Sequence, residues 1–558
     1  MLRIWTLFIL IIVFFTAIIF RLFYWQIIRG DDLRSQASAQ YNLELTIPAV
    51  RGTIADVRGS PLAMNQQASL VYGQPKEIEN KPMVAKLIAP LLKVEEPSLL
   101  ETLSLPDRVW VPLAHKVETP VVDEIKKMNI KGIGFEPEPK RYYPEASMAA
   151  QLLGFVGSDQ NGQDMGYFGL EGFYDRELRG RGGSIQMEKD VQGSAILVGD
   201  SRRTEAQDGR SLVLWTDRTV QHIAESRLSA GIEKYGAKEG TVTIMDPKTG
   251  GILAMATYPS YDPARYGDFD RTLYKNPIVA STYEPGSTYK VLVVSGAIQE
   301  KAVKADTIMN EEGPVDVGDY TIRTWNNQYH GPITITKVLE YSSNVGMVFI
   351  GNKLGKEKLL KYIHAYGFGS PTGIDLQEES SPEMRKDTEW RDIDLATASF
   401  GQGIAVTPIQ MVRAVGALAN DGWLMEPHMV KEIVDSTGKK TEIKPKKVRQ
   451  VVSASTADIL TEMMVSAVDL GEAKWAKPAG YRIAGKTGTA QIPVAGHYDE
   501  KKTIASFVGF GPADDPKFVM LVTLREPQSS PWGSETAAPL FFNIARDLFA
   551  YYSLPASP

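Results

Sequence analysis

A serine and a lysine stand three residues apart at the start of an apolar run. Ser287 and Lys290 lie in YEPGSTYK (283–290), and the apolar residues 291–294 follow. This pattern predicts that a helix begins here, and residues three apart share a helix face, so Lys290 can reach the Ser287 hydroxyl. The helix dipole favours an alkoxide, and partial burial lowers the pKa of a lysine enough for it to act as a base. Two interpretations follow: a nucleophile with its base, or a helix-capping serine followed by a surface lysine.

A second serine also has a lysine three residues beyond it, in a different setting. Ser436 and Lys439 lie in VDSTGKKTEIKP (434–445), a polar and charged segment between short strand patterns. Such a composition is typical of a hairpin tip in solvent. Ser436 is therefore expected to be structural, and Ser287 is the candidate nucleophile.

Two further polar motifs follow Ser287 along the chain. SSN (342–344) opens a helix-like run, and KTGT (486–489) lies in a strand pattern in the last part of the sequence. A Lys-Thr-Gly triplet also occurs at 248–250, but there it lies in a tight turn between two strand patterns and is expected to shape that turn. The order Ser-x-x-Lys, Ser-x-Asn, Lys-Thr-Gly matches a known serine acyl-transfer signature and is far more specific than any one motif.

The segments around these motifs predict an antiparallel sheet with helices on its faces. Strand patterns occur at residues 212–215, 240–245, 252–255, 504–510 and 518–524. Helical patterns occur at 335–354, 407–419 and 540–552. Because the strands come from both ends of this region, one α+β domain is expected to enclose all three motifs.

The first residues form an apolar run with the length of a membrane-spanning helix. Residues 4–20 are uncharged and almost wholly apolar, Arg21 interrupts them, and residues 22–28 extend the segment. Tyr24 and Trp25 suit the aromatic belt of a membrane interface. Since no small-x-small cleavage site follows the run, an uncleaved anchor is favoured over a secretory signal peptide.

Length and composition limit the remaining possibilities. The 558 residues are too many for one ordinary domain, and the texture of the sequence changes near residue 210. A net charge of −6 offers no polyanion-binding surface, so a nucleic-acid partner is not expected. The absence of cysteine excludes disulfides, thiolate metal sites and a cysteine nucleophile. The six histidines are scattered without an HxH or HExxH pair, so neither a zinc site nor a histidine base is expected.

The three motifs resemble those of penicillin-binding proteins and serine β-lactamases, and the chain as a whole resembles a class B penicillin-binding protein. Further stretches carry this resemblance: RGTIADVRG (51–59), RYYPEASMAAQLLGFVG (141–157), GYFGLEGFYDRELRG (166–180), MDPKTGGILAMATYPSYDP (245–263) and SFGQGIAVTPIQM (399–411). The sequence departs from the family in two places. The family usually has Tyr-Asp-Arg-Asn-Gly where residues 55–59 read Ala-Asp-Val-Arg-Gly, and often has Gly in place of Ala146.

The resemblance implies a monofunctional peptidoglycan D,D-transpeptidase built from three parts. These are a transmembrane signal-anchor helix (1–28), an elongated mixed pedestal or dimerisation domain (29–210) and a transpeptidase domain (211–558). The last part should have the α+β fold shared with β-lactamases, an antiparallel sheet flanked by helices. The pedestal shows no sign of a glycosyltransferase of its own.

The resemblance also assigns roles to the first two motifs. Ser287 would attack the carbonyl of a stem peptide that ends in D-Ala-D-Ala, and Lys290 would take its proton. Ser342 would relay a proton to the departing D-alanine, and Asn344 would hold a substrate amide. The acyl group would then pass to an amine on a neighbouring stem peptide.

The third motif is implied to bind the substrate carboxylate. Lys486 would supply a positive charge, and Thr487 and Thr489 would offer hydroxyls, with Gly488 between them in the binding strand. The backbone N–H groups of Ser287 and Thr489 would form an oxyanion hole. No metal or organic cofactor is needed.

The location and partners follow from the same resemblance. The catalytic domain would lie outside the bacterial plasma membrane, with the N-terminus inside. Expected partners are lipid-linked or nascent peptidoglycan stem peptides, β-lactam antibiotics, a polytopic membrane glycosyltransferase and other cell-wall assembly proteins. A role in cell division and a role in elongation and cell shape both remain open.

Two rival interpretations use the same motifs. A D,D-carboxypeptidase or β-lactamase would pass the acyl group to water, but the long pedestal and the anchor argue against a simple hydrolase. A non-catalytic penicillin receptor or scaffold would use the acyl-enzyme only as a signal, and further signalling segments would favour it.

Overall fold

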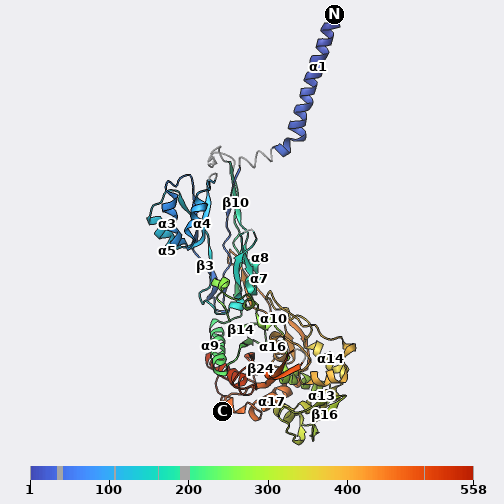
Figure 1. The fold of residues 1–558 in the computed structure, drawn as a ribbon. Coiled ribbons are helices and arrows are strands. Elements are labelled where there is room, and N and C mark those ends of the chain that lie inside the picture. The colour runs from blue at the N-terminus through green and yellow to red at the C-terminus, as the bar shows by residue number, and fades with distance from the viewer. Residues whose placement is uncertain are drawn as a thin grey trace. The chain divides into compact units, whose positions relative to one another are not determined.

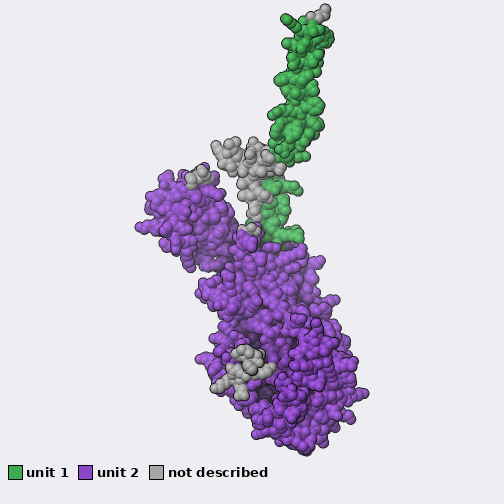
Figure 2. Space-filling view, turned by 45° about the vertical axis from the view of Figure 1, so that its right-hand side comes forward, with its two compact units in different colours: residues 1–50, 180–209 green, residues 51–179, 210–558 purple. Residues whose placement is uncertain are grey.

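The computed structural model describes residues 2–33, 42–105, 108–160, 162–188, 201–494 and 497–556. The chain forms two compact units, residues 1–50 with 180–209 and residues 51–179 with 210–558 (Figures 1 and 2). The second unit contains all of the candidate motifs.

The first unit contains the apolar N-terminal helix that the sequence predicts. Helix α1 (Leu2–Phe23) continues into a π-helical turn, η1 (Tyr24–Ile28), and together they are long and apolar enough to cross a membrane. No side chain of α1 is buried in the protein. The unit also contains an antiparallel sheet in the order β1 (Asn42–Ile47), β10 (Gly183–Glu188), β11 (Ser201–Thr204).

A five-stranded antiparallel sheet lies at the centre of the second unit and confirms the predicted α+β fold. Its order is β14 (Ile252–Tyr258), β13 (Glu239–Met245), β25 (Phe518–Arg525), β24 (His497–Gly511), β23 (Ala484–Val494). The two strands at its start come from one end of the domain, and the other three come from the opposite end. Strand β23, which carries the KTGT motif, is therefore an edge strand with one side unpaired.

Helices cover both faces of this sheet (Figure 1). Helices α9 (Arg218–Tyr235) and α18 (Ala537–Tyr551) pack on one face, and α16 (Pro408–Leu418) packs on the other. Because successive strand residues point to opposite faces, Phe507 packs in the core with α9 and α18, and Val508 packs in the core with α16. The core that contains α16 also contains α11 (Lys290–Gln299), whose residues 290–298 are all buried. Ser287 is thus placed at the entrance to an almost wholly buried helix.

One predicted helix is wrong in its extent. Residues 335–354 form two helices, α12 (Ile335–Glu340) and α13 (Asn344–Leu354), because the chain turns between them. Ser342 has a left-handed φ of 54°, which ends the helical path. The Ser343 hydroxyl then accepts the Gly346 N–H at 2.8 Å and caps α13. Local hydrogen bonding by serines therefore overrides the apolar periodicity.

A six-stranded sheet joins segments from both sides of residue 210. Strand β12 (Ser211–Leu214) pairs in parallel with β2 (Ile54–Ala55) and antiparallel with β20 (Val430–Val434). The full order is β21 (Lys440–Glu442), β20, β12, β2, β3 (Pro61–Gln66), β7 (Lys140–Tyr142).

The remaining elements surround these two sheets. A smaller subdomain has the sheet order β5 (Val111–Glu118), β4 (Ala68–Gly73), β6 (Ile133–Pro137), with α3 (Lys81–Leu92), α4 (Glu96–Leu103) and α5 (Thr119–Lys127). The other strand pairs are β8 (Phe155–Ser158) with β9 (Asp164–Tyr167), β15 (Ile308–Glu311) with β18 (Gly331–Thr334), β16 (Val315–Val317) with β17 (Tyr320–Ile322), and β19 (Trp423–Met425) with β22 (Lys447–Gln450). The other helices are α6 (Ala150–Leu153), α7 (Gly169–Phe173), α8 (Asp175–Arg179), η2 (Pro263–Asp268), η3 (Arg271–Tyr274), α10 (Pro277–Ala280), η4 (Gly286–Tyr289), α14 (Lys356–Ala365), η5 (Asp387–Glu389), α15 (Asp392–Ser399), α17 (Ala454–Leu470) and η6 (Lys474–Ala476).

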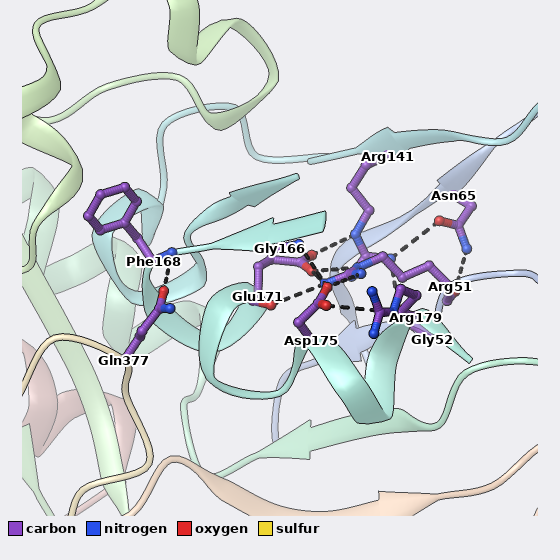
Figure 3. A network of polar contacts seen from close by, with 10 residues as sticks. All are labelled: Arg51, Gly52, Asn65, Arg141, Gly166, Phe168, Glu171, Asp175, Arg179 and Gln377. Atoms are coloured by element: carbon purple, nitrogen blue, oxygen red, sulfur yellow. Dashed lines mark hydrogen bonds and ion pairs between the residues drawn. The ribbon is translucent and has the colours of Figure 1, made fainter. Parts of the chain in front are cut away.

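A buried ionic network holds three of the family-like stretches together (Figure 3). Arg51 donates from Nε to Glu171 and from Nη1 to Asp175, both at 2.7 Å. Arg141 donates from Nε to the other oxygen of Glu171 at 2.7 Å and from Nη1 to the Gly52 carbonyl at 2.8 Å. Since Glu171 is fully buried, removal of either arginine partner would cost about 3–5 kcal/mol. The charged residues of stretches 51–59, 141–157 and 166–180 therefore pair with one another and hold the three stretches together.

Ala146, which stands where the resembled family often has glycine, has a backbone conformation that favours glycine. This exposed alanine has a left-handed φ of 50°, a conformation that a Cβ disfavours and glycine adopts freely. We expect Ala146→Gly to raise the free energy of unfolding by about 0.5–1 kcal/mol, because relief of backbone strain exceeds the entropy that glycine adds to the unfolded chain. Thermal denaturation checks this, with Ala264→Gly, at an exposed position of ordinary φ, as the control. A lower melting temperature for Ala146→Gly than for the parent protein would contradict it.

Candidate active site

Ser287 lies in a tight 3-10 turn that leads into α11. The turn η4 (Gly286–Tyr289) begins at Gly286, which has a left-handed φ of 54° and donates its N–H to the Gly401 carbonyl at 3.0 Å. A Cβ on Gly401 would lie 2.1 Å from the Gly286 carbonyl oxygen, so only glycine allows this approach. The Ser287 hydroxyl is half-buried and accepts no capping hydrogen bond from the backbone N–H groups of η4 or α11, which rules out the interpretation as a helix cap.

Lys290 is fully buried, so its interpretation as a surface lysine is wrong. Its Nζ donates to the Ser342 carbonyl at 2.6 Å, to Asn344 Oδ1 at 2.9 Å and to Ser342 Oγ at 3.3 Å. These bonds bring the first two motifs together. The direct hydrogen bond to Ser287 that helical spacing predicts is not formed in the structure, because the amine is directed toward the SSN motif instead.

The surroundings of Lys290 favour its neutral form. Burial lowers the pKa of Lys290 well below its usual range, and the positive charge of Lys486 lowers it further. The carboxylates of Glu472 and Glu311 oppose this shift without reversing it. A buried lysine with a lowered pKa is suited to accept a proton near neutral pH.

The SSN motif occupies the turn between α12 and α13. Ser343 points away from Lys290 and donates to the buried carboxylate of Glu311, while its oxygen caps α13. Asn344 is held at both ends of its amide, since Oδ1 accepts from Lys290 and Nδ2 donates to the Arg323 carbonyl at 3.1 Å. The cap that Ser343 forms on α13 therefore helps to position its two neighbours, Ser342 and Asn344, toward Lys290.

The KTGT motif lies on the unpaired edge of the sheet. Lys486 is buried and donates from Nζ to Thr487 Oγ1 at 2.9 Å, and Thr487 in turn donates to Glu472 Oε2 at 3.0 Å. Burial lowers the pKa of Lys486, and Glu472 opposes that effect. The Gly533 N–H donates to Thr489 Oγ1 at 2.9 Å, which ties the motif to the loop after β25.

The turn of Ser287 packs directly on this edge strand. A Cβ on Gly488 would lie 2.7 Å from Thr288 Cγ2 and 2.4 Å from Ser506 Oγ, so the strand can approach the turn only at a glycine. The Thr489 carbonyl lies 3.0 Å from the position of a Cβ on Gly286. Backbone groups on the free edge of β23 are therefore next to the nucleophile candidate.

The three motifs line one cleft. Ser287, Ser342, Asn344 and residues 487–489 form part of its wall, and the amines of Lys290 and Lys486 lie beneath that wall. A half-buried serine, two buried amines and free backbone N–H groups in one cleft can perform acyl transfer.

Two known families together match most of this chain. Residues 240–546 match the family "Penicillin binding protein transpeptidase domain", and residues 46–214 match "Penicillin-binding Protein dimerisation domain". The chain belongs to the class B penicillin-binding proteins. It is 36% identical to stage V sporulation protein D of Bacillus subtilis, over 96% of this chain and 83% of that protein. It is 31% identical to the probable peptidoglycan D,D-transpeptidase PenA of Neisseria meningitidis, over 96% and 90%.

Solved structures agree with this assignment. Penicillin binding protein 3 from Mycobacterium tuberculosis, complexed with aztreonam, superposes with a TM-score of 0.71 at 27% identity, over 92% of this chain and 98% of that one. Penicillin binding protein 2X from Streptococcus thermophilus superposes with a TM-score of 0.77 at 26% identity, over 92% and 80%. This class B penicillin-binding protein is a membrane-bound peptidoglycan D,D-transpeptidase that binds β-lactams, which confirms the transpeptidase interpretation.

The second Ser-x-x-Lys motif (436–439) and the second Lys-Thr-Gly triplet (248–250) lie elsewhere in this penicillin-binding protein. Ser436 lies in the turn between β20 and β21, where the Asp435 carboxylate accepts backbone N–H groups at the hairpin tip. Lys248 is exposed in the turn between β13 and β14 and pairs with Asp515 at 2.5 Å. Neither residue lines the cleft. Both positions agree with the structural uses that the sequence predicts.

Some cleft residues were not predicted from the sequence. Trp325 and Trp532 pack edge to face with their ring centroids 4.9 Å apart, and Glu472 and Gln402 also line the cleft. Gln402 lies in SFGQG, a stretch already noted for its family resemblance. Trp325, Glu472 and Trp532 lie in loops far apart in sequence, where no local pattern marks them.

Proposed function

We propose that Ser287 is the nucleophile of the transpeptidase and that Lys290 is its general base. The observation that carries this proposal is the buried Lys290 amine, which has a lowered pKa and lies beneath the cleft that Ser287 lines. Ser287 Oγ bonds to the carbonyl carbon of the penultimate D-alanine, and Lys290 accepts the hydroxyl proton. The peptide C–N bond then breaks, and the serine ester remains.

Ser342 carries the proton to the leaving group. Its Oγ lies 3.3 Å from Lys290 Nζ, so the proton taken from Ser287 can pass through it to the nitrogen of the departing D-alanine. Asn344, fixed by Lys290 and the Arg323 carbonyl, holds a substrate amide in the cleft. The acceptor amine then attacks the ester by the reverse path, and Ser287 regains its proton.

The KTGT motif binds the substrate carboxylate and the oxyanion. Lys486 supplies the charge, the hydroxyls of Thr487 and Thr489 donate hydrogen bonds, and Gly488 keeps the strand against the Ser287 turn. The backbone N–H groups of Ser287 and Thr489 form the oxyanion hole, where each donor contributes about 2.7–4 kcal/mol to catalysis.

Peptide mapping tests the assignment of the nucleophile. The full-length protein is labelled with fluorescent penicillin and digested, and the labelled peptide is identified by mass spectrometry. We expect the label on the peptide that contains Ser287. A label on any other serine would refute the assignment while leaving penicillin binding itself intact.

The acylation rate should first rise and then fall as the pH is increased. Lys290 accepts a proton only when neutral, and because its pKa is lowered, the rate should rise with pH and level off well below the ordinary lysine pKa of about 10.4. Lys486 must stay protonated to bind the carboxylate, so the rate should fall again as Lys486 loses its proton. The second-order rate constant for penicillin labelling, measured across this range, checks both limbs. A rate that still rises at the ordinary lysine pKa would contradict the role of Lys290.

We also propose the division into an anchor (1–28), a pedestal (29–210) and a transpeptidase domain (211–558). Peptidoglycan lies outside the cytoplasmic membrane, which supports an N-terminus inside the cell and a catalytic domain outside a bacterial plasma membrane. The pedestal, which carries no transpeptidase motif, is available for a polytopic glycosyltransferase and other cell-wall assembly proteins. The acyl donor would be lipid-linked or nascent peptidoglycan.

The anchor proposal predicts how the protein fractionates. Because residues 2–28 form one exposed apolar helix, the protein should stay with the membrane through high-salt and carbonate washes and keep these residues. Intact mass measurement of the membrane fraction checks this. A soluble form that begins beyond residue 28, recovered from intact cells, would contradict it.

A further inference from the structure

A second cavity lies in the transpeptidase domain, away from the cleft. It has a volume of about 470 Å³, and its lining includes the loop 367–373, His364, Arg413, Glu426 and Arg449. None of its lining residues lines the cleft of Ser287. Any ligand here would therefore be separate from the acylation site.

Arg413 brings an uncompensated charge to this cavity. It projects from the buried helix α16 and is only 5% exposed. Its Nε donates to the Met425 carbonyl at 3.0 Å, and its two Nη groups have no hydrogen-bond or ion-pair partner in the described part of the chain. Burial and the neighbouring charge of Arg449 lower the pKa of Arg413 to about 10. A buried guanidinium without a carboxylate partner is costly, and an anion in the cavity would relieve that cost.

The acidic groups nearby are already engaged. Glu379 accepts the backbone N–H groups of Thr372 and Gly373, and Glu426 pairs with Lys446 at 2.6 Å. Neither forms an ion pair with Arg413, although both are close enough to act on its pKa. The cavity therefore keeps two cations, Arg413 and the exposed Arg449, for an incoming anion.

We propose that this cavity binds the terminal carboxylate of a peptide, with Arg413 as the anchor and Arg449 at the mouth. A guanidinium fork matches a planar carboxylate in a bidentate manner. The negative charges of Glu379 and Glu426 disfavour a doubly charged phosphate more than a singly charged carboxylate. On the proposed function, the carboxylate-ended peptides that this protein meets are peptidoglycan stem peptides, so the cavity is a second, non-catalytic stem-peptide site.

The experiment uses the full-length protein in detergent with Ser287 already blocked by benzylpenicillin. Blocking is verified by the mass increase, which tests the proposed function separately from the second site. Binding of an N-acylated peptide ending in D-Ala-D-Ala is then measured by equilibrium dialysis, beside its C-terminal amide and beside inorganic phosphate. The same measurements are made on Arg413→Gln, Arg449→Gln and, as a matched exposed control on α18, Arg546→Gln.

We expect the acylated protein to bind the carboxylate peptide at one site, and the amide at least about tenfold more weakly, because charge-assisted hydrogen bonds are lost. Arg413→Gln and Arg449→Gln should each weaken binding by a similar factor, and Arg546→Gln should not change it. Should Arg413→Gln fail to fold, the exposed Arg449→Gln carries the same expectation. Equal binding of peptide and amide, or unchanged binding in the variants, would overturn the proposal. Phosphate that binds in place of the peptide and depends on Arg413 would overturn the carboxylate assignment.

Discussion

Ser287→Ala should abolish covalent labelling by penicillin and leave the fold almost unchanged. The substitution removes the only atom that can form the ester, so no slower route to the same adduct remains. Its hydroxyl makes no capping bond in the described structure, so the free energy of unfolding should change by less than about 0.5 kcal/mol. Labelling is read by gel fluorescence and mass spectrometry, and stability is read by thermal denaturation.

Lys290→Met extends this test to the base. The variant keeps a long unbranched side chain in the buried site but cannot accept a proton, so acylation should also be lost. In contrast to Ser287→Ala, it leaves Asn344 Oδ1 and the Ser342 carbonyl without their shared donor, so a modest loss of stability is expected.

Ser436→Ala is the matched control for both variants. It removes a serine with the same spacing to a lysine, from a hairpin tip outside the cleft, and should change neither labelling nor stability. Labelling that persists in Ser287→Ala, or that is lost in Ser436→Ala, would show that the wrong serine has been assigned.

Lys486→Ala should lower the acylation rate by about thirtyfold or more. Lys486 is buried, and truncating one partner of a buried charge pair costs about 2–5 kcal/mol, here the pair with the substrate carboxylate. Loss of its charge should also raise the pKa of Lys290, which places less neutral base at a given pH. Both effects act in the same direction, and the second-order rate constant for penicillin labelling measures their sum.

Lys248→Ala is the control from the other Lys-Thr-Gly triplet. Its ammonium pairs with Asp515 on the surface, an interaction worth less than about 1 kcal/mol, and it lies outside the cleft. The acylation rate should stay near that of the parent protein. Equal losses in the two variants would mean that the charge of Lys486 has no specific part in substrate binding.

The sequence by itself determined the family, the three motifs and most of the elements that carry them. The strand patterns near residues 240–258 and 504–524 correspond to β13, β14, β24 and β25, because a short run of apolar and β-branched residues is a local property that one segment expresses alone. The apolar run of residues 4–28 likewise predicts α1 without any partner. The contrast between Ser287 and Ser436 could be drawn from the composition on either side of each serine.

Only the tertiary structure decided which groups meet. Nothing near Lys290 in sequence shows that its amine bonds to the SSN motif or that Lys486 and Glu472 act on its pKa. Nor does the sequence around Arg413 show that it lies buried with no carboxylate partner among the described residues. The break at Ser342 likewise depends on a cap and on the contact between Ser343 and Glu311. The physical reason is that hydrogen bonding, burial and Coulomb interactions act through space, over a few ångströms, between residues that are tens or hundreds of positions apart in the chain.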